Sequence, residues 1–487
     1  MRLAQLLEEI VGEMLFEGEW DREISMLSMR SDEEMKNALF FCLEGEVSDG
    51  HLYASEAVRK GAVAVVTERK LALNVPQFLT KSTRVALAKI SSKFHGKPSE
   101  QLKIIGITGT NGKTTTAYML SSILKESGKN VGVIGTLGVR YGEKYYPSNL
   151  TTPDPIELHR IFLDMRICGV THVVMEVSAH SLYYQKVAGI AFCACIFTNL
   201  SQDHLDFFSD MESYGRAKAD LFTQSVCPIA ILNGDEKMGR ILGKQREEWE
   251  GKTIYYGLDT PSDAFAIVTK EALEGSTAIF NINDKLCRVR VSMVGIHNIY
   301  NALAASTCAY ALGVSIHDIA RGLTHFSGVD GRLEHVCSYR GADIFVDFAH
   351  TPDALQKSLN SLRPHTKGRL ICLFGCGGNR DKSKRPLMGE VVAKNADFSI
   401  LSSDNPRYED PLDIISGMEK GYRRFSVRYV IVPDRAKGIE YGMDFLKEGD
   451  VLLIAGKGGE KTQEIMGIKY PFVDQDIVKS YLEKNGK

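Results

Sequence analysis

The chain has 487 residues, which at roughly 150 residues per domain predicts about three domains and excludes a single hydrophobic core. Hydrophobic residues make up 44% of the chain and charged residues 25%, so it is neither a disordered nor a collagen-like polymer. Because 59 Lys and Arg face 61 Asp and Glu, the net charge of −2 indicates no nucleic-acid or membrane-surface partner.

Cysteine use and hydropathy give the expected compartment. The ten cysteines are scattered without a CxxC pair, which favours a reducing environment, and we expect a cytoplasmic protein. Residues 1–16 carry Glu8, Glu9 and Glu13 among apolar residues at helical spacing, so they predict a helix and not a signal peptide. No stretch approaches the roughly 18 apolar residues of a membrane span.

The pattern along the chain predicts an α/β protein of three domains. Residues 1–98 predict a small N-terminal α/β domain, with strands at 38–45 and 62–69 and a Gly/Pro-bearing linker at 95–99. Residues 99–328 alternate strand and helix patterns, which predicts a doubly wound, mostly parallel sheet. Residues 329–487 predict a Rossmann-like domain with five further strands, at 342–350, 369–378, 397–404, 428–434 and 450–459.

The strongest local pattern is GITGTNGKTT at 106–115, between a predicted strand and a predicted helix. Its glycines let backbone N–H groups surround phosphate oxygens, Lys113 brings a positive charge to the β and γ phosphates, and Thr114 offers a hydroxyl to Mg²⁺. Five residues instead of the usual four separate Gly106 from Gly112, so the loop is a variant. The alternative is an empty glycine turn, but the flanking elements favour an ATP site formed by Gly109, Thr110, Asn111, Gly112, Lys113, Thr114 and Thr115.

Candidate metal ligands follow two other predicted strands. Glu176 ends the run HVVMEVS, and Asn199 and His204 follow ACIFTNL. Taken alone, Glu176 is more often a solvated carboxylate at a strand end, and His204 a polar cap. Their position beside a phosphate loop favours the metal-binding interpretation instead.

Eleven motifs in order resemble the Mur ligase family, in particular the members that add the third peptide residue to a UDP-linked muramoyl dipeptide: TGTNGKTT, TTPDP, MEVSAH, FTNLSQDHLD, YGRAKADLF, NIYNALAA, DGRLE, DFAHTPDAL, FGCGGNRDKSKRP, SSDNPR and AGKGGE. The resemblance covers nearly the whole chain. It implies an N-terminal domain for the uridine nucleotide, a central ATPase and a C-terminal domain for the incoming amino acid.

The resemblance implies ATP-driven amide formation in peptidoglycan synthesis, through an acyl phosphate that an amine displaces. Such a reaction needs positioning and charge neutralisation but no protein nucleophile. The implied substrates are UDP-MurNAc-L-Ala-D-Glu and meso-diaminopimelate, and we expect a monomer. The implied catalytic residues are Lys113, Glu176, Asn199, His204 and Lys218.

By resemblance, Thr114, Glu176, His204 and Lys218 hold Mg²⁺, with Lys218 carbamylated by CO₂. Without the resemblance, Lys218 would be an ordinary surface lysine on an amphipathic helix. The resemblance also implies that Asn301 contacts the adenine. It implies nucleotide contacts from the hinge and the C-terminal domain, and therefore domain closure, through Arg332, Asp347 and His350.

The implied UDP-substrate site contains several departures from the family pattern. Lys186 stands where the family usually has Arg, Gln185 comes one place late, and Arg30-Ser31-Asp32 replaces Asp-Ser-Arg, although slippage to Ser28 stays open. Arg and Lys are not interchangeable at a bidentate carboxylate site. The residues implied for this site are Ser31, Thr151, Thr152, Ser178, Tyr184 and Lys186.

The motif DNPR predicts the incoming amino acid. Arg407 can form a planar fork with a second carboxylate, which meso-diaminopimelate has, whereas it would repel the ammonium of lysine. The alternative is a plain loop in which Arg407 pairs with Glu409 or Asp410. Gly459 replaces the histidine of the family's GKGHE. The implied amino-acid site comprises Arg380, Asp404, Asn405, Pro406, Arg407, Gly456 and Glu460.

Three functions therefore stay open after the sequence. The first is the diaminopimelate-adding ligase. The second is a paralogue that joins L-lysine or another amine to a different carboxylate, which the departures at Lys186 and Gly459 keep open. The third is a non-catalytic ATP-binding module, which the full set of Thr114, Glu176, His204 and Lys218 disfavours.

Overall fold

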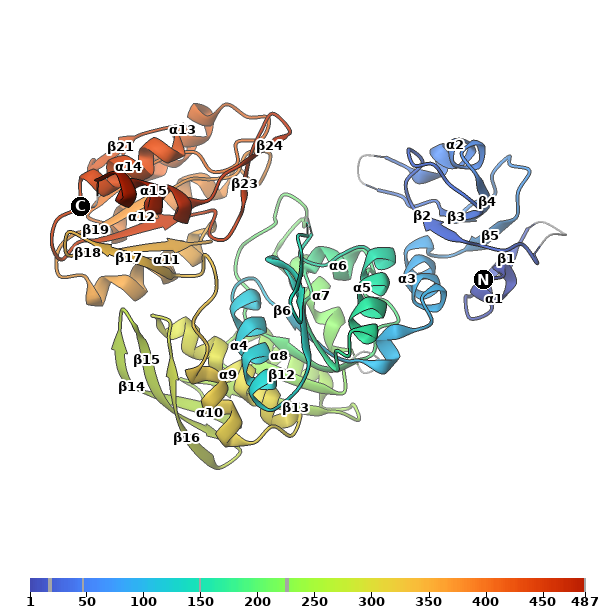
Figure 1. Ribbon diagram of the computed structural model, residues 1–487, viewed down its shortest axis with the longest axis horizontal. Coiled ribbons are helices and arrows are strands. Elements are labelled where there is room, and N and C mark those ends of the chain that lie inside the picture. Colours follow the sequence, from blue (N-terminus) through green and yellow to red (C-terminus); the bar gives the residue numbers. More distant parts are fainter. Residues whose placement is uncertain (16–19, 46–47, 149, 224–226, 486–487) are drawn as a thin grey trace. The chain divides into compact units, whose positions relative to one another are not determined.

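The structure is a computed structural model that describes residues 1–15, 20–45, 48–148, 150–223 and 227–485 (Figure 1). The chain forms two compact units, and each is described by itself. The first unit contains residues 1–106, 129–195 and 220–228. The second contains residues 107–128, 196–219 and 229–487.

The N-terminal part of the first unit is a five-stranded sheet with helices on both faces. The strand order is β1-β5-β4-β3-β2, and only β1 is antiparallel to its neighbour. Alternate residues of β3 and β4 pack against α1 and α3 on one face and against α2 on the other, as period-2 strands require. The elements are α1 (Leu3–Leu7), β1 (Gly12–Met14), β2 (Met26–Ser28), β3 (Ala38–Phe41), η1 (Gly50–Tyr53), α2 (Ala54–Arg59), β4 (Ala62–Thr67), β5 (Gln77–Thr80) and α3 (Thr83–Phe94).

The predicted helix over residues 1–16 is wrong beyond Leu7, where α1 ends. The next segment, Gly12–Met14, instead forms β1 and pairs with the edge of β5. A Cβ atom on Gly12 would lie 2.5 Å from the Leu79 carbonyl oxygen, so glycine is what lets the chain approach the sheet edge here.

The rest of the first unit is built on a mixed sheet in the order β11-β6-β10-β7-β8-β9. β10 is parallel to β7, and β8 and β9 extend the sheet as antiparallel neighbours. The strands β6 and β11 begin in this unit and end in the second. The elements are η2 (Pro98–Gln101), β6 (Lys103–Thr108), β7 (Val131–Gly135), β8 (Gly138–Tyr141), β9 (Lys144–Tyr146), α5 (Pro155–Ile167), β10 (His172–Glu176), α6 (Ala179–Tyr183), β11 (Phe192–Phe197) and η3 (Asp220–Phe222).

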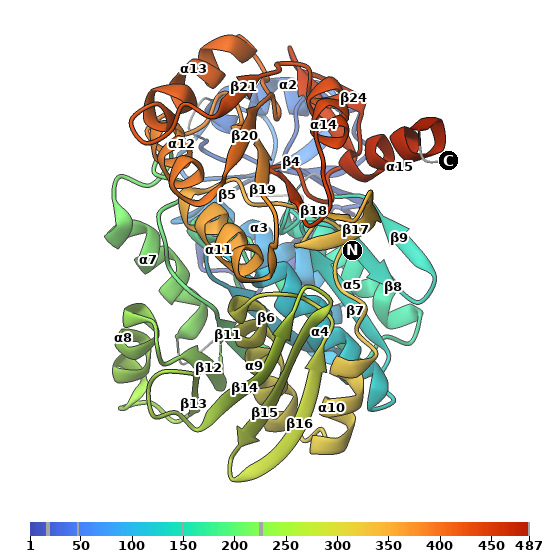
Figure 2. The ribbon, with the colours of Figure 1, turned by 90° about the vertical axis from the view of Figure 1, so that its left-hand side faces the viewer.

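The second unit begins with α4 and continues with parallel strands β12–β14, followed by an antiparallel ribbon β14–β16 that the sequence analysis did not predict (Figure 2). One face of this ribbon packs on helices α9 and α10. The elements are α4 (Lys113–Glu126), α7 (Met211–Ala219), β12 (Ile229–Asn233), α8 (Lys237–Arg246), β13 (Lys252–Gly257), β14 (Ala264–Ala272), β15 (Gly275–Ile282), β16 (Lys285–Val291), α9 (Ile296–Ala311) and α10 (Ile316–Thr324).

The C-terminal part of the second unit confirms the predicted Rossmann-like sheet. The strand order is β17-β18-β22-β19-β20-β21, and all neighbours except β17 and β18 are parallel. The elements are β17 (Glu334–Tyr339), β18 (Ala342–Asp347), α11 (Pro352–Leu362), η4 (Arg363–His365), β19 (Leu370–Phe374), α12 (Lys384–Asn395), β20 (Phe398–Leu401), α13 (Pro411–Tyr422), β21 (Tyr429–Ile431), α14 (Arg435–Asp444), β22 (Val451–Ala455), β23 (Thr462–Ile465), β24 (Ile468–Pro471) and α15 (Asp474–Asn485).

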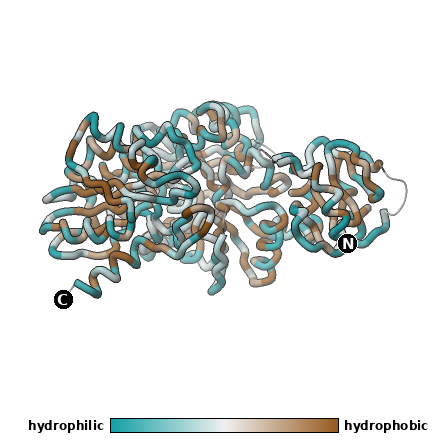
Figure 3. Tube along the Cα trace, turned by 90° about the horizontal axis from the view of Figure 1, so that it is seen from above, coloured by the Kyte–Doolittle hydropathy of each residue, from teal (hydrophilic) through white to brown (hydrophobic). Residues whose placement is uncertain are grey.

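Two hydrophobic layers cover this C-terminal sheet. Helices α11, α12 and α13 pack on one face, and α14 and α15 pack on the other. Hydrophobic segments run through the interior of this part, and hydrophilic ones lie outside (Figure 3). The parallel strands end at one edge of the sheet, so the loops after β18, β19, β20 and β22 are neighbours there, as predicted for a ligand site.

All ten cysteines are free thiols. Among the described residues, the longest apolar helices fall short of what crossing a membrane requires.

Candidate active site

The predicted phosphate loop lies between β6 and α4, as expected. Lys113 folds back over the loop, and its Nζ donates to the carbonyl oxygens of Gly109 (2.8 Å) and Thr110 (2.9 Å). Gly112 is the residue before α4 and has φ +84°; a Cβ there would lie 2.4 Å from Asn301 Oδ1. Thr114 and Thr115 are buried in the first turn of the helix, whose positive end favours anions.

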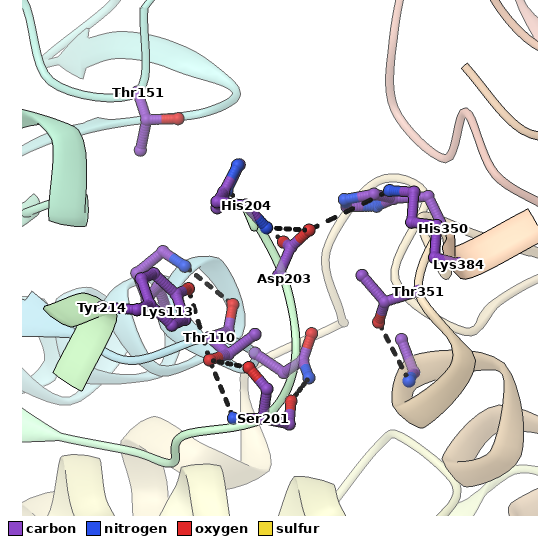
Figure 4. Close-up of polar contacts among 12 residues, drawn as sticks. Thr110, Lys113, Thr151, Ser201, Asp203, His204, Tyr214, His350, Thr351 and Lys384 are labelled. Carbon is purple, nitrogen blue, oxygen red and sulfur yellow. Dashed lines mark hydrogen bonds and ion pairs between the residues drawn. The ribbon is translucent and has the colours of Figure 1, made fainter. Parts of the chain in front are cut away.

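The loop is braced by the segment after β11. Asn199 Oδ1 accepts from the Asn111 backbone N–H (2.9 Å), and its Nδ2 donates to the Asn111 carbonyl (3.1 Å). Thr110 Oγ1 donates to the Ser201 carbonyl and accepts from the Ser201 N–H (Figure 4). Asn199 is therefore a support of the phosphate loop in this structure.

One carboxylate from the C-terminal part joins this network. Asp353 Oδ2 accepts from Asn111 Nδ2 (2.8 Å), Ser201 Oγ (3.0 Å) and Lys357 Nζ (2.9 Å). The sequence analysis did not assign Asp353. Its place two residues after Thr351, whose side chain caps α11, gave no sign of a contact reaching residue 111.

His204, in the segment after β11, lies in a cluster of ionisable groups with Asp203, His350 and Lys384 (Figure 4). Its backbone has φ +55°, and its Nε2 lies 3.4 Å from Asp203 Oδ2. Lys384 Nζ lies 3.9 Å from Asp203 Oδ1. Burial of Asp203 would raise its pKa, but His204 and the other cationic neighbours outweigh burial and hold the pKa below its usual range.

His350 lies in the turn after β18 and is close to this cluster. Its Nδ1 donates to the Phe348 carbonyl (2.7 Å), which leaves Nε2 as the acceptor nitrogen of a neutral ring. Burial, and then the charge of Lys384, lowers the pKa of His350, so the neutral form is favoured.

Lys218, on α7, is the most unusual group of the site. Its side chain is 1% exposed, and its Nζ donates to the Gly109 carbonyl (2.9 Å) and lies 4.3 Å from the Tyr214 ring centroid. Burial, reinforced by the charge of Lys113, lowers the pKa of Lys218 well below its usual value. The alternative of a surface lysine, which the pattern of the helix alone favours, is therefore wrong, because the Lys218 side chain is buried against the Gly109 carbonyl.

Of the other predicted nucleotide residues, Arg332 contacts the end of the phosphate loop, Asn301 contacts α4, and Asp347 contacts the hinge. Arg332 Nη2 donates to Thr114 Oγ1 (3.1 Å), and its guanidinium lies 4.2 Å from the Phe348 ring centroid. Asn301 Oδ1 accepts from Thr116 Oγ1 (3.3 Å). Asp347 is occupied by the protein itself, since its carboxylate accepts from Ser358 Oγ and from the N–H groups of Leu333 and Ala349.

Glu176 belongs to the first unit, where it ends β10 with no exposed surface. Its carboxylate accepts from the Thr136 N–H (3.0 Å) and from Thr136 Oγ1 (3.1 Å). Thr152 Oγ1 donates to the Glu176 carbonyl (2.9 Å), and Thr136 Oγ1 is 3.2 Å from Thr151 Oγ1. The TTP turn therefore lies at the end of β10.

The other residues predicted for the UDP-substrate site contact neighbouring side chains or backbone within the first unit. Lys186 Nζ lies 2.7 Å from Asp154 Oδ1, and Arg84 stacks 4.2 Å from the Tyr184 ring centroid. Ser178 caps α6 by accepting from the Ser181 N–H. Ser31 Oγ donates to Glu56 Oε2 (3.2 Å) in the N-terminal part.

The DNPR loop lies beside the glycine-rich turn after β22. Arg407 has φ +53°; its Nη1 donates to the Gly378 carbonyl (2.8 Å), and its Nε is 3.3 Å from Glu464 Oε2. The alternative pairing of Arg407 with Glu409 or Asp410 is wrong: Arg407 pairs with Glu464. Glu409 pairs with Arg385, and Asp410 caps α13.

Asn405 is a support within this loop. Its Oδ1 accepts from Lys457 Nζ (3.1 Å) and the Glu464 N–H (2.9 Å), and its Nδ2 donates to Glu460 Oε2 (2.8 Å). Lys457 Nζ also pairs with Glu460 (2.9 Å). Sequence reasoning did not assign Lys457, although it lies within the quoted motif AGKGGE.

The remaining predicted residues of the amino-acid site differ in burial. Arg380 is exposed after β19, whereas Asp404 and Pro406 are buried. A Cβ on Gly456, which has φ +121°, would lie 2.4 Å from Asp404 Oδ2, so the two loops touch at this point. The backbone at Gly458 runs closely past Gly331: a Cβ on Gly331 would lie 2.0 Å from the Gly458 carbonyl carbon, and a Cβ on Gly458 would lie 2.5 Å from the Gly331 carbonyl oxygen.

The predicted metal ligands fit magnesium by their donor chemistry, although no group of three His, Cys, Asp or Glu side chains lies together in the described ranges. Thr114 and Glu176 supply the hard oxygen donors that Mg²⁺ prefers. Lys218 supplies no oxygen as an amine. Burial lowers the pKa of this amine, which favours the neutral form, and neutral amines are the form of lysine that can react with CO₂.

The chain is similar to known proteins over its whole length. Family models match residues 23–108 (Mur ligase family, catalytic domain), 107–309 (Mur ligase middle domain) and 331–458 (Mur ligase, glutamate ligase domain). A protein of Caldanaerobacter subterraneus subsp. tengcongensis named UDP-N-acetylmuramoyl-L-alanyl-D-glutamate–2,6-diaminopimelate ligase is 40% identical over 100% of both chains. A Clostridium acetobutylicum protein of the same name, numbered 1, is also 40% identical, over 98% of this chain and 99% of its own.

Solved structures share the three-domain fold. A structure of a UDP-N-acetylmuramoyl-L-alanyl-D-glutamate–2,6-diaminopimelate ligase matches with a TM-score of 0.71 and 28% identity, over 100% of this chain and 99% of its own. The Thermotoga maritima MurF ligase in complex with ADP matches with a TM-score of 0.62 and 22% identity, over 94% of this chain and 97% of its own. With relatives 40% identical over its whole length, the chain belongs to the Mur ligase family.

Proposed function

We propose that this Mur ligase adds meso-diaminopimelate to UDP-MurNAc-L-Ala-D-Glu at the expense of ATP, in peptidoglycan synthesis in the cytoplasm. One observation carries the proposal: relatives 40% identical over their full length are named for that reaction. The phosphate loop, the oxygen donors beside it and a charged loop at the carboxyl edge of a parallel sheet are the parts this reaction needs.

We propose that the working modules are residues 1–98 for the uridine nucleotide, 99–328 for ATP, and 329–487 for the incoming amino acid, acting in a monomer. Ser31 would contribute to the first, and Thr151, Thr152, Ser178, Tyr184 and Lys186 would hold the acceptor end of the dipeptide. Thr152 supports this role, because it is already fixed to the end of β10 through the Glu176 carbonyl.

ATP would bind with its phosphates in the loop 109–115. The backbone N–H groups and Lys113 would hold the phosphates, after the Lys113 amine leaves the carbonyls of Gly109 and Thr110. Asn301 would contact the adenine. Arg332 and His350 would approach the nucleotide from the hinge and the C-terminal module, and Asp347 would act by holding the hinge through Leu333.

The chemistry follows from bringing three substrates together. An oxygen of the dipeptide's terminal carboxylate attacks the γ-phosphorus of ATP, ADP leaves, and an acyl phosphate forms. The amine nitrogen of diaminopimelate then attacks the acyl carbon, phosphate leaves with the carbon–oxygen bond pair, and the nitrogen loses its proton. Backbone N–H groups, Lys113 and Arg332 stabilise the negative charge that develops during both steps.

Magnesium, when bound through Thr114, Glu176, His204 and carbamylated Lys218, supplies positive charge beside the phosphate oxygens. The lowered pKa of Lys218 supports the carbamate, because a neutral amine has the lone pair that attacks CO₂. The nitrogen forms a bond to the CO₂ carbon and releases one proton, so the neutral amine becomes a carbamate anion that would lie next to the metal cation.

The amine would be selected by the loop after β20. Arg407, supported by Glu464 and the Gly378 carbonyl, would turn its guanidinium fork toward the distal carboxylate of diaminopimelate. Glu460 would receive the distal ammonium, and Arg380 would lie at the mouth of the site.

An assay of the purified protein tests this function. With ATP, Mg²⁺ and UDP-MurNAc-L-Ala-D-Glu, we expect phosphate release and a product of the correct mass with meso-diaminopimelate but not with L-lysine. Turnover with lysine alone would overturn the choice of amine, and no turnover with either would overturn the proposed reaction.

Arg407→Ala is expected to raise the KM for diaminopimelate at least about tenfold through loss of a charged pair, whereas the exposed control Arg423→Ala should leave it unchanged.

A further inference from the structure

A second arginine of the C-terminal part is fully buried behind the amine-selecting loops. Arg435 is the first residue of α14, and Asp474 is the first of α15. Both side chains have no exposed surface in this ion pair. The guanidinium meets the carboxylate through two hydrogen bonds, from Nε to Oδ1 (2.7 Å) and from Nη2 to Oδ2 (2.7 Å).

The remaining donors of Arg435 reach two strand ends. Its Nη1 donates to the Ser403 carbonyl (3.2 Å), and its Nη2 donates to the Ala455 carbonyl (3.1 Å). Ser403 immediately precedes Asp404 of the DNPR loop, and Ala455 immediately precedes Gly456 of the AGKGGE turn. These are the two loops that carry the proposed amino-acid site.

The energetics favour a positioning role over a purely stabilising one. A fully buried ion pair loses so much hydration that apolar residues of similar volume are commonly as stable or more stable. Apolar side chains cannot, however, donate to two carbonyls at once. The pair instead fixes the relative position of two segments, because the rigid guanidinium of Arg435 joins the chain just after β20 to the end of β22. Asp404 and Gly456 are in contact at the same point.

We propose that Arg435, held by Asp474, is a positioning residue for the incoming amino acid, setting the spacing between the DNPR loop and the AGKGGE turn. The proposal rests on the proposed function for the identity of the amine. The positioning of the two loops by the Arg435–Asp474 pair does not depend on the proposed function, because the pair contacts the protein backbone. Neither residue touches the substrate.

The chain offers a matched control at the opposite edge of the same sheet. Arg369 and Asp450 precede β19 and β22, and they form an ion pair in which Arg369 Nε donates to Asp450 Oδ2 (3.1 Å). This pair fastens the amino ends of the strands, away from the loops of the site. Its loss should cost stability without changing the site.

The experiment compares Arg435→Lys, the double variant Arg435→Met/Asp474→Leu, and the control Arg369→Met/Asp450→Leu in the full-length enzyme. For the first double variant, which leaves no unpaired buried charge, we expect a folded protein. Its KM for meso-diaminopimelate should rise at least about tenfold, or about 1.4 kcal/mol, with the KM values for ATP and the UDP-dipeptide within about twofold. Arg435→Lys should show a smaller rise, because one ammonium can keep the charge but not the fork. The control should keep the wild-type KM for the amine.

A folded double variant with a wild-type KM for the amine, or with all three KM values raised together, would overturn the proposal. Amide hydrogen exchange measured without substrates tests the positioning role of Arg435 independently of the proposed function. We expect faster exchange at residues 403–408 and 455–460 in Arg435→Lys than in the wild type, and unchanged exchange there would also overturn it. If the wild type failed to ligate diaminopimelate while these amides still lost protection, the positioning role of Arg435 would stand and the proposed amine would not.

Discussion

At the scale of single residues, burial alters the protonation equilibrium of Lys218. Lys218 is 1% exposed and has one carbonyl acceptor, and burial lowers the pKa of its amine, which favours the neutral form over the ammonium. With ¹³C-bicarbonate, we expect a carbamate resonance in the carbon NMR spectrum of the wild type. Activity should fall at least about tenfold in CO₂-depleted buffer and return with bicarbonate, as loss of a metal-supporting group predicts.

Lys218→Ala should lose both the resonance and the bicarbonate response. The exposed lysine of α13 provides the control, since Lys420→Ala should keep both. A carbamate resonance that persists in Lys218→Ala would assign the modification to another lysine.

Gly112 gives a second prediction at the residue scale. Gly112→Ala places a Cβ at φ +84° and 2.4 Å from Asn301 Oδ1, so both the loop and the asparagine must shift. We expect the KM for ATP to rise roughly tenfold or more. Gly128→Ala is the matched control, because its φ of +77° brings the same backbone strain but its Cβ would meet no atom within 4 Å. Equal KM values for the two variants would show that strain, and not the Asn301 contact, determines the effect.

At the scale of elements, α5 buries a histidine at a cost that depends on pH. His159 has no exposed surface, and neither ring nitrogen has a hydrogen-bond partner among the described residues. Burial lowers its pKa from 6.5 to about 3. Below pH 6.5 the unfolded chain therefore binds the proton more readily than the folded one, and stability falls as the pH drops toward 3.

From these values, about 1.5 pH units separate pH 5 from the unfolded pKa, which amounts to roughly 2 kcal/mol of lost stability. We expect His159→Leu to remove this loss, so that its urea midpoint falls less than that of the wild type between pH 7 and pH 5. His317→Leu, at an exposed histidine of α10, should not change the pH dependence. An identical acid response of the wild type and His159→Leu would assign the loss to other groups.

The elements also mark where sequence reasoning succeeds and fails. Apolar runs that are buried on both faces, such as those of β18, β19, β20 and β22, are visible as strands because nothing but a sheet interior suits them. The β14–β16 ribbon was missed because one face is solvated. Its mixture of charged and apolar residues does not stand out without knowledge of its partners.

The same reason applies to the site. A phosphate loop is contiguous in the chain, so its residues were predictable, and the strand-end motifs could be placed by resemblance. The partners of Asp353, Arg435 and Lys457 could not be predicted from the sequence, because each contact joins segments that only the fold brings together. Burial of Lys218 was equally invisible, since the rotation of α7 about its axis is set by tertiary packing.

At the scale of the whole molecule, hydrogen bonds join the ATP-binding part around the phosphate loop to the hinge and the C-terminal module. Asp353 is central to them, because one carboxylate oxygen accepts from Asn111 and Ser201 of the ATP-binding part and from Lys357 of its own helix. Hydrogen bonds to a charged group contribute about 1.5–3 kcal/mol each. The loss of the two hydrogen bonds from Asn111 and Ser201 would therefore shift the equilibrium between the docked and the undocked C-terminal module substantially.

We therefore expect Asp353→Ala, without nucleotide, to speed amide hydrogen exchange at residues 109–115 and 199–201, where the module rests on the loop. Exchange within the C-terminal sheet should not change, since no strand loses a contact. Asp413→Ala is the control, because Asp413 also lies in the first helical turn after a proline but has no contact with the loop in the described residues. A non-hydrolysable ATP analogue should reduce the difference, because Arg332 already reaches Thr114 and the nucleotide would add a second link across the same boundary. Exchange at 109–115 that is equal in Asp353→Ala and Asp413→Ala would mean that the carboxylate only caps its helix, and that the hinge at Arg332 holds the module unaided.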